Sequence, residues 1–435
     1  MMTEFRAIAL VAALLQFMAC ASAEARRVPS SRVPASTDLT VAEDSDFYLD
    51  DKEDAANVKD AKSLNPFGHT RFRGLHVNGA DSPHFDLIQK AKKTLDIEIY
   101  EMQDVDFRQA LRDAMKRGVR VRVVKDPTPL GERCNVFKAD TEDDKADCRE
   151  QRSLVAEVIK NQGAYVAFNK AELCGIPGRS CYEHGKIIIV DGKIALISTG
   201  NFNSSNLCNA RQDPKTCNRD YSFITRRRPL VNALTKVFEK DLIGTRYDVK
   251  QVLAPSDFKL LTVSPYSLQP LIDFINTAKE SVEIENQYLK EPTFNEALIK
   301  VAKSGVKVKI TLSSACAFGA PTRSAADSLK ALYSSFDAAG IDTRMFTSQV
   351  KVDGRSGYMH AKSIVVDGKY AWVGSVNGSS TSMNQNREYG LFFKQRRNVK
   401  LLLSTMRSDH DEPGTESWDE SLRCVKDHGS SPDGE

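Results

Sequence analysis

Two stretches of the chain show the same succession of hydrophobic and polar positions. After Pro83, apolar residues fall at the spacing of an amphipathic helix: Leu87, Ile88, Ala91 and Leu95. A short strand is expected over 96–100, and a second helix ends at Gly118, a typical stop signal. A β-branched strand is then expected over 119–124. Strands that alternate with helices in this way predict an α/β layered domain.

The same succession returns at a constant offset of 187 residues. Identical residues recur in register, among them Pro83/Pro270, Ile97/Ile284, Phe107/Phe294 and Gly118/Gly305. The second copy predicts strands over 282–286 and 306–312. Because the match runs without a gap, we interpret it as an internal duplication rather than chance similarity between two α/β units.

Both copies continue into a second shared segment, now at an offset of 176. Residues 184–193 read HGKIIIVDGK and residues 360–369 read HAKSIVVDGK. Each is an apolar strand, an Asp-Gly turn and another strand, and Asp-Gly between such strands predicts a β-hairpin. The change of offset means that the first copy is longer between Gly118 and His184. Four cysteines lie in this extra length, so we expect loops tied by disulfides.

The N-terminus has the pattern of an export signal. Residues 7–19 are apolar except for Gln16, and Ala21-Ser22-Ala23 fits a small-x-small cleavage site. The run is too short to span a bilayer, so we expect a cleaved signal peptide over 1–23 and a secreted or periplasmic protein. The alternative is a lipoprotein anchor at Cys20.

Composition and charge narrow the class of protein. Hydrophobic residues make up 41% and charged residues 27% of the 435 residues, which excludes a mainly disordered, collagen-like or multi-span membrane protein. The net charge of +3 is uneven: −4 over 24–70, +14 over 71–407 and −7 over 408–435. A basic body suggests an anionic substrate or surface, such as a phosphate ester, a nucleic acid or a lipid headgroup. The alternative is a basic soluble protein with no such partner.

These patterns suggest five regions. We expect the signal peptide to be followed by a flexible acidic linker over 24–70. One α/β lobe then covers 71–250 and a second covers 251–407. An acidic C-terminal tail is expected over 408–435.

The cysteine count fits an exported protein. Nine cysteines become eight if Cys20 leaves with the signal peptide, and an even number implies disulfides. Sequence cannot fix the connectivity, but proximity suggests Cys134–Cys148, Cys174–Cys181 and Cys208–Cys217, which leaves Cys316 with Cys424. Because no pair has the spacing of zinc ligands, we expect no metal site.

The two His-x-Lys segments carry the candidate chemistry. Residues two apart on a strand share a face, so His184 lies beside Lys186 and His360 beside Lys362. Imidazole can act as nucleophile or general acid/base, and an ammonium suits the non-bridging oxygens of a phosphate. Two such pairs could split a phosphodiester in two steps without a metal or cofactor. The alternative is a pair of structural histidines.

The other histidines are expected on the surface. They are His69, His76, His84, His410 and His428.

At this point the chain resembles the phospholipase D superfamily, whose signature is a doubled His-x-Lys-x4-Asp motif. The resemblance covers about 71–407. The second motif fits closely: Gly374-Ser375-Val376-Asn377 is followed at family spacing by Ser382, Asn386 and Glu388. In the first copy, Gly200-Asn201-Phe202-Asn203 looks like the same element two residues late. Either Asn201 or Asn203 is therefore the candidate amide.

A second element of the first copy also departs from the second. The sequence Asn218-Arg219-Asp220-Tyr221 parallels Asn386-Arg387-Glu388-Tyr389, with Asp in place of Glu. Cys208 and Cys217 precede it, so a disulfide-closed loop near the site could tune substrate choice.

The resemblance implies two similar α/β lobes, each a mixed sheet flanked by helices, related by a pseudo-two-fold and sharing one active site. It implies that His184 attacks phosphorus and that His360 acts as acid and base. Lys186, Lys362 and the amides would hold the phosphoryl oxygens. Asp191 and Asp367 would orient the histidines; the alternative is that both only shape the Asp-Gly turns. The expected substrate-binding residues are Asn201, Asn203, Asn218, Asp220, Ser375, Asn377, Asn386 and Glu388.

We therefore expect an exported, monomeric phospholipase D-like phosphodiesterase that hydrolyses or transphosphatidylates phospholipids at a membrane surface. One alternative is a nuclease that cleaves DNA or RNA by the same mechanism. Others are a cardiolipin synthase-like phosphatidyltransferase and an inactive secreted binding protein.

Overall fold

The computed structural model describes residues 74–78, 82–130, 134–138, 145–209, 215–318 and 321–425. The predicted signal peptide, Cys20 and the predicted linker over 24–70 lie outside these residues. Among the described residues, no helix is long and apolar enough to cross a membrane.

The first copy folds around a seven-stranded mixed sheet. Its strands, in spatial order, are β1 (Gly74–Val77), β7 (Tyr221–Thr225), β6 (Ile194–Ser198), β5 (Lys186–Val190), β2 (Thr94–Ile99), β3 (Arg120–Lys125) and β4 (Ala164–Ala167). Pairs β2–β3 and β3–β4 are parallel, and the remaining pairs are antiparallel.

The second copy repeats this plan in an eight-stranded mixed sheet. Its order is β17 (Glu416–Ser417), β11 (Asp342–Phe346), β10 (Lys307–Ser313), β9 (Ser281–Asn286), β14 (Ser363–Val366), β15 (Tyr370–Gly374), β16 (Tyr389–Phe393) and β8 (Leu261–Val263). Strands β9, β10 and β11 are parallel neighbours, as β2, β3 and β4 are in the first sheet. A separate ribbon pairs β12 (Lys351–Val352) with β13 (Arg355–Ser356).

Helices cover both sheets. In the first lobe they are α3 (Pro83–Lys90), α4 (Val105–Lys116), α5 (Ala146–Lys160), α6 (Lys170–Leu173), α7 (Ser204–Leu207), α8 (Arg228–Ile243), α9 (Val249–Val252) and the 3-10 turn η2 (Asp257–Lys259). In the second they are α10 (Leu268–Asn276), α11 (Pro292–Lys303), η3 (Ala315–Phe318), α12 (Arg323–Ala338), α13 (Ser380–Asn384), α14 (Arg396–His410) and α15 (Trp418–Ser421).

The predicted stop of the second helix at a glycine is confirmed in both copies. The first helix is shorter than predicted, because α3 ends at Lys90 and Leu95 lies in β2. The Asp104 side chain caps α4 by accepting a hydrogen bond from the Phe107 amide. Gly118 and Gly305 follow α4 and α11 with φ of +86° and +97°, in the left-handed region that only glycine enters at little cost. The same local signals therefore build the same helix in both copies.

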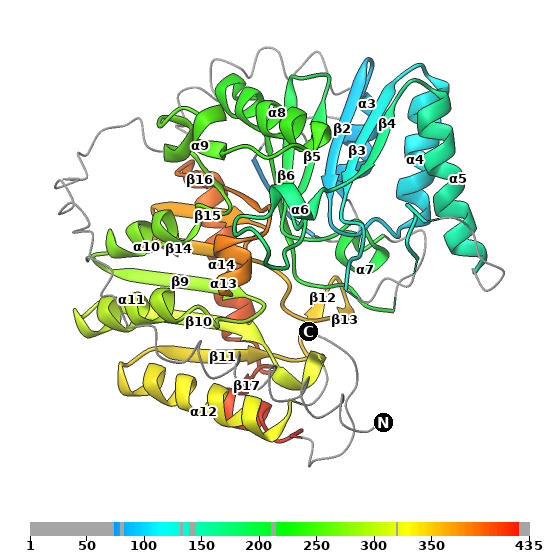
Figure 1. Cartoon of the computed structure of the whole chain (residues 1–435). Helices are drawn as coiled ribbons and strands as arrows, with labels where there is room; N and C mark the ends of the chain where they lie inside the picture. Colours follow the sequence, from blue (N-terminus) through cyan, green and yellow to red (C-terminus); the bar gives the residue numbers. More distant parts are fainter. Residues whose placement is uncertain are drawn as a thin grey trace, which may run out of the picture. The chain divides into compact units, whose positions relative to one another are not determined.

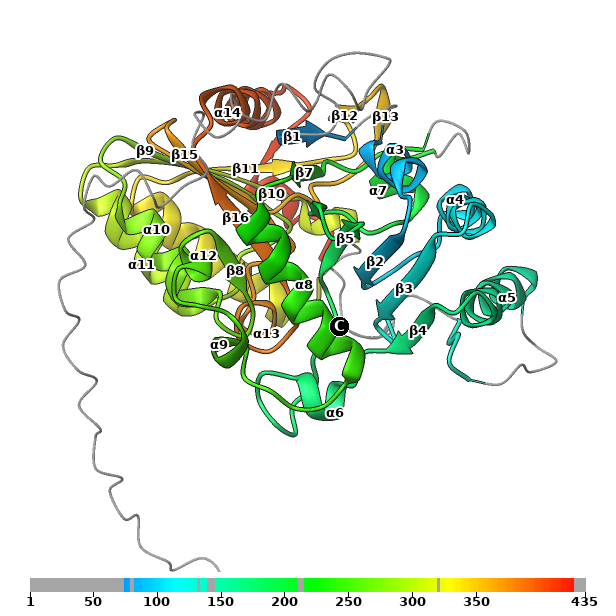
Figure 2. The same cartoon turned by 90° about the horizontal axis from the view of Figure 1, so that it is seen from above.

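The two sheets share a central hydrophobic cluster, and helices cover their outer faces. Helices α4 and α5 cover the outer face of the first sheet, and α10, α11 and α12 cover the outer face of the second, while α8 lies between the lobes (Figures 1 and 2). A central hydrophobic cluster joins residues of both sheets with α8 and α14, for example Ile187, Phe238, Val365 and Leu402. Each sheet also has its own outer cluster.

All four predicted disulfides are present: Cys134–Cys148, Cys174–Cys181, Cys208–Cys217 and Cys316–Cys424.

The predicted acidic tail is wrong for residues 408–425. Helix α14 continues to His410, β17 pairs with β11, and Cys424 is bonded to Cys316. The prediction took the density of acidic residues as the sign of a tail, but several of these residues make specific contacts within the fold. Asp409, for example, binds Arg219.

Two of the histidines expected on the surface are buried. His84 Nδ1 shares a hydrogen bond with Ser82 Oγ (2.7 Å), and His410 Nδ1 shares one with Thr311 Oγ1 (3.0 Å). His69 and His428 lie outside the described residues.

Candidate active site

The two histidine segments lie where the lobes meet. His184 lies just before Gly185 and β5, and His360 lies shortly before β14; both strands are in the middle of their sheets. The His184 amide donates to the Arg387 carbonyl (2.9 Å), and the His360 amide donates to the Arg219 carbonyl (3.1 Å). Each histidine is therefore held by backbone of the opposite lobe.

A carboxylate from the opposite lobe also binds each imidazole. His184 Nδ1 lies 2.9 Å from Glu388 Oε2, and His360 Nδ1 lies 2.8 Å from Asp220 Oδ1. A carboxylate can only accept here, so each Nδ1 carries the hydrogen and Nε2 is left for chemistry. This crossed arrangement is what a nucleophile and an acid/base require.

The predicted role of Asp191 and Asp367 as orienting carboxylates is wrong, and the alternative holds. Both have a φ of +52° and form the hairpin turns with the glycine that follows. Asp191 accepts from the amides of Lys93 (2.7 Å) and Thr94 (2.9 Å), and Asp367 accepts from Glu280 (2.8 Å) and Ser281 (3.0 Å). Their carboxylates bind the starts of the neighbouring strands β2 and β9 rather than the histidines.

Burial sets the protonation of both imidazoles. Desolvation lowers the pKa of His184 and of His360 to about 4, although the facing carboxylate works in the opposite direction. Burial also opposes ionisation of Asp220 and Glu388, but the charge and hydrogen bond of the paired histidine outweigh it and lower both carboxyl pKa values. At neutral pH the resting site therefore holds two neutral imidazoles and two carboxylates.

Both lysines are buried beside their histidines. Lys362 Nζ lies 3.3 Å from His360 Nε2 and 3.4 Å from the Thr199 carbonyl of the first lobe. Lys186 donates to the His184 carbonyl. Burial lowers the pKa of Lys186 to about 8 and that of Lys362 to about 7, and the two ammonium groups influence each other, so they serve one site.

The structure separates Asn201 from Asn203. The Thr199 amide donates to the Tyr221 carbonyl as the Ser375 amide donates to that of Tyr389, so Thr199 matches Ser375 at the offset of 176. Asn201 therefore matches Asn377. Both are nearly buried and each has an Oδ1 atom with no hydrogen-bond partner. The shift of two residues inferred from Gly200 was wrong.

Asn203 has a local role instead. Its Oδ1 accepts from the Asn206 amide (2.9 Å) and caps α7, as Ser379 caps α13. The Nδ2 atoms of Asn201 and Asn203 both donate to Glu101 (3.0 and 2.9 Å), whose pKa is raised by burial.

Of the remaining predicted residues, Asn386 and Ser375 support Glu388, and Asn218 binds the segment before His360. Asn386 Nδ2 donates to Glu388 Oε1 (3.0 Å), and Ser375 Oγ accepts from the Tyr389 amide (3.0 Å). Asn218 Oδ1 accepts from the Tyr358 amide (3.4 Å). These groups position the site.

Sequence reasoning missed Asn206. Its Nδ2 donates to Asp220 Oδ2 (2.6 Å) and lies 3.1 Å from His360 Nδ1. It stands at the offset of 176 from Ser382, whose hydroxyl donates to Glu388. The offset alone could have identified it.

Among the described residues, no group of three or more His, Cys, Asp or Glu side chains is arranged to hold a metal ion.

Comparisons with known proteins agree with this geometry. The chain matches the family described as "Cardiolipin synthase, PLD-like domain" twice, over residues 85–242 and 271–410. It is 25% identical over 349 residues to the major cardiolipin synthase ClsA of Bacillus subtilis (strain 168), covering 74% of this chain and 65% of that protein. It is 26% identical over 240 residues to cardiolipin synthase A of Pseudomonas syringae pv. syringae (strain B728a), covering 52% and 44%. The chain thus spans less than two thirds of either relative.

A solved structure has the same fold. Phosphatidylserine synthase of Haemophilus influenzae Rd KW20 superposes with a TM-score of 0.54 at 12% identity, covering 83% of this chain and 91% of that one. The two matched regions hold both His-Lys-Asp segments and most of the chain, and the chain therefore belongs to the phospholipase D superfamily, whose enzymes act on phosphodiesters.

Proposed function

We propose that this protein is an exported phospholipase D-type enzyme that cleaves the headgroup phosphodiester of phospholipids and passes the phosphatidyl group to water or to an alcohol. The observation that carries the proposal is the crossed pair of contacts, His184 with Glu388 and His360 with Asp220, beside two buried lysines. Export rests on the signal-like N-terminus and fits the four disulfides.

In the first step, His184 Nε2 attacks phosphorus. A P–N bond forms, the P–O bond to the headgroup alcohol breaks, and His360 gives its Nε2 proton to the leaving oxygen. The bound phosphate anion raises the pKa of a nearby imidazole, so that His360 holds this proton although it is neutral at rest.

In the second step, water or an acceptor alcohol attacks phosphorus. His360 takes the proton of the attacking hydroxyl, and the P–N bond breaks. Lys186, Lys362 and the amides of Asn201 and Asn377 stabilise the charge on the phosphoryl oxygens.

A phosphatidyltransferase of the cardiolipin synthase kind is the second candidate. The two curated relatives bear that name, and the same two steps produce transfer when the acceptor is another lipid hydroxyl.

A substrate panel tests both. Purified protein is incubated with vesicles of phosphatidylcholine, phosphatidylethanolamine, phosphatidylglycerol or cardiolipin, and with DNA and RNA, each with and without added glycerol. Release of phosphatidic acid supports hydrolysis, and cardiolipin formed from phosphatidylglycerol supports the transferase. Cleavage of DNA or RNA without cleavage of any lipid would contradict both candidates and identify a nuclease. If the folded wild-type protein turns over none of these substrates, a binding protein is favoured. The His184→Ala variant serves as the inactive control.

A trapping experiment tests the roles of the histidines. In His360→Asn, attack on a p-nitrophenyl phosphodiester needs no acid, but the intermediate lacks a base to release it. We expect a phosphoryl adduct on His184, read by intact-protein mass spectrometry and peptide mapping at non-acidic pH. An adduct only on His360, in His184→Asn, would reverse the roles.

A further inference from the structure

The disulfide Cys208–Cys217 stands where the second copy has a peptide bond. The offset between the copies is 176 up to Cys208 and 168 from Cys217 onward. Cys208 and Cys217 therefore occupy the places of Asn384 and Gln385, which are consecutive in the chain. Residues 209–216 are an insertion of the first copy, and the disulfide closes it at its base.

Backbone hydrogen bonds fix this register on both sides of the insertion. The Asn218 amide donates to the Ser205 carbonyl (2.9 Å), and the Asn386 amide donates to the Thr381 carbonyl (2.9 Å). These pairs correspond at the two offsets. The backbone on the two sides of the insertion therefore makes the same hydrogen bond as the uninterrupted backbone of the second copy.

The two flanks of the insertion supply the groups that hold His360. Asp220 lies after it and accepts from His360 Nδ1 (2.8 Å). Asn206 lies before it, with its Nδ2 atom 3.1 Å from His360 Nδ1; since both nitrogens carry hydrogen, Asn206 acts on the imidazole through Asp220. The two side chains bind each other through Asn206 Nδ2 and Asp220 Oδ2 (2.6 Å). The orientation of the imidazole therefore depends on two segments that are separated by the insertion.

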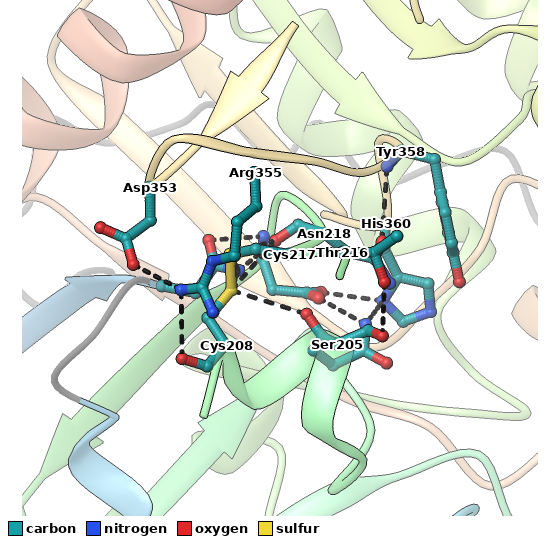
Figure 3. Close-up of a disulfide and its surroundings, with 12 residues drawn as sticks. Ser205, Cys208, Thr216, Cys217, Asn218, Asp353, Arg355, Tyr358 and His360 are labelled. Carbon is teal, nitrogen blue, oxygen red and sulfur yellow. Dashed lines mark hydrogen bonds and ion pairs between the residues drawn. A yellow bond between two sulfur atoms is a disulfide. The ribbon is translucent and has the colours of Figure 1, made fainter. Parts of the chain in front are cut away.

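The cystine also packs against the segment that leads to His360. The Cys217 amide donates to the Ser356 carbonyl (2.8 Å), and Arg355 donates to the Cys208 carbonyl (3.4 Å) (Figure 3). A Cβ atom on Gly357 would lie 2.0 Å from the Cys217 carbonyl oxygen, so a side chain there would clash. Both cysteines are fully buried.

The other histidine has no such dependence. Glu388, which holds His184, is bound by Ser382 and Asn386 on one uninterrupted stretch of chain. Loss of the Cys208–Cys217 bond should consequently affect His360 and spare His184.

We propose that the Cys208–Cys217 disulfide is a positioning element of the active site, which keeps Asn206 on Asp220 and Asp220 on His360 and so sustains the acid and base steps of His360. The proposal rests on the two-histidine function proposed above.

The test removes the bond with Cys208→Ser/Cys217→Ser. The matched control, Cys134→Ser/Cys148→Ser, removes a bond of similar loop length (14 against 9 residues) in the same lobe, so the loss of chain constraint is comparable. Turnover is measured for an alkyl phosphodiester, whose leaving group needs a proton, and for a p-nitrophenyl diester, whose leaving group does not.

General acid–base catalysis supplies a factor of about 10² to 10⁴. Because His360 is displaced and not removed, we expect kcat for the alkyl diester to fall by less than the full factor, about 10- to 100-fold. The first turnover of the p-nitrophenyl diester should stay within about threefold, and the adduct on His184 should accumulate, because release also uses His360. The control should show neither the dependence on the leaving group nor the adduct.

A second variant keeps the test decisive if the first does not fold. Residues 209–216 are deleted and both cysteines replaced by serine, so that a peptide bond joins positions 208 and 217 as in the second copy. The Cα atoms are 4.9 Å apart, close to the 3.8 Å across a peptide bond. We expect this variant to regain alkyl-diester turnover to within about fivefold of the wild type.

The proposal would be overturned if Cys208→Ser/Cys217→Ser lost turnover equally on both diesters and the control variant lost a similar amount. The disulfide would then stabilise the fold in general. So would a rejoined variant that folds and still shows the selective loss. A folded wild-type protein that turns over no phosphodiester would instead refute the proposed function itself.

Discussion

Replacing Glu388 with Gln should disable His184 while leaving the fold intact. Glu388 is fully buried; its Oε2 faces His184 Nδ1, and its Oε1 accepts from Ser382 and Asn386. In Glu388→Gln, the amide oxygen stays on the side with the two donors, and the NH2 group turns toward the histidine. An NH2 group cannot accept from Nδ1–H, so the imidazole must switch tautomer and place its hydrogen on Nε2, the atom that attacks.

The size of the effect follows from the bond that is lost. A hydrogen bond to a charged group contributes about 1.5–3 kcal/mol. Since each 1.36 kcal/mol is a factor of about ten in rate, kcat should fall about 10- to 100-fold. The assay is the single-turnover rate on a p-nitrophenyl phosphodiester, with thermal unfolding followed by circular dichroism to establish that the variant is folded.

Asp191→Asn is the matched control. The Asp191 carboxylate binds the amides of Lys92, Lys93 and Thr94 and no histidine. We expect the rate to stay within about twofold and stability to fall by about 1 kcal/mol, the worth of a typical hydrogen bond. A rate loss in Asp191→Asn as large as that in Glu388→Gln would refute the assignment of the orienting carboxylates.

Three further predictions concern the lysines, the lobe interface and the cysteines. Lys362 is charged below about pH 7 and His184 is neutral above about pH 4, so kcat/KM should decline above pH 7 and below pH 4. Lys362→Arg should shift only the alkaline decline, to higher pH; an unchanged alkaline decline would exclude Lys362 as its source. Asp241→Asn leaves the buried Arg387 without its 2.7 Å ion pair and should cost about 3–5 kcal/mol in denaturant unfolding. Glu280→Gln breaks only the exposed pair with Lys369 and should leave the unfolding curve nearly unchanged; equal losses would contradict a buried interface. The mature protein, denatured without reductant, should show no titratable thiol, and two or more would contradict the four disulfides.

Patterns local in the chain predicted the fold well. The glycine stops and the Asp-Gly turns predicted the helix ends and hairpins, because each depends on residues a few positions apart, and the repeat at an offset of 187 predicted the same elements in the second copy. The repeated segments also identified the two histidine–lysine pairs that the structure brings together between the lobes. The short cysteine spacings also predicted three disulfides by proximity.

The partners of the histidines could not be predicted in this way. Asp191 is close to His184 in sequence, but its carboxylate points to the start of β2, whereas Glu388 comes from the opposite lobe. Matching Gly200 with Gly374 also placed Asn203 in the site. The hydrogen bond of Thr199 to Tyr221 establishes that the offset of 176 continues through Asn201. The contact of His184 with Glu388 depends on how the two sheets face each other, which no local pattern states.

The crossed contacts between the lobes also constrain how this chain can evolve. Each copy holds one histidine and the carboxylate that the other histidine needs, so neither copy can lose a residue without affecting its twin. The shorter Asp220 is accommodated opposite His360 together with Asn206, where Glu388 and Ser382 serve His184. We therefore expect loss of the carboxylate in one copy to impair the histidine of the other copy. A gene cut between the lobes would yield two inactive fragments whose activity returns only when they associate.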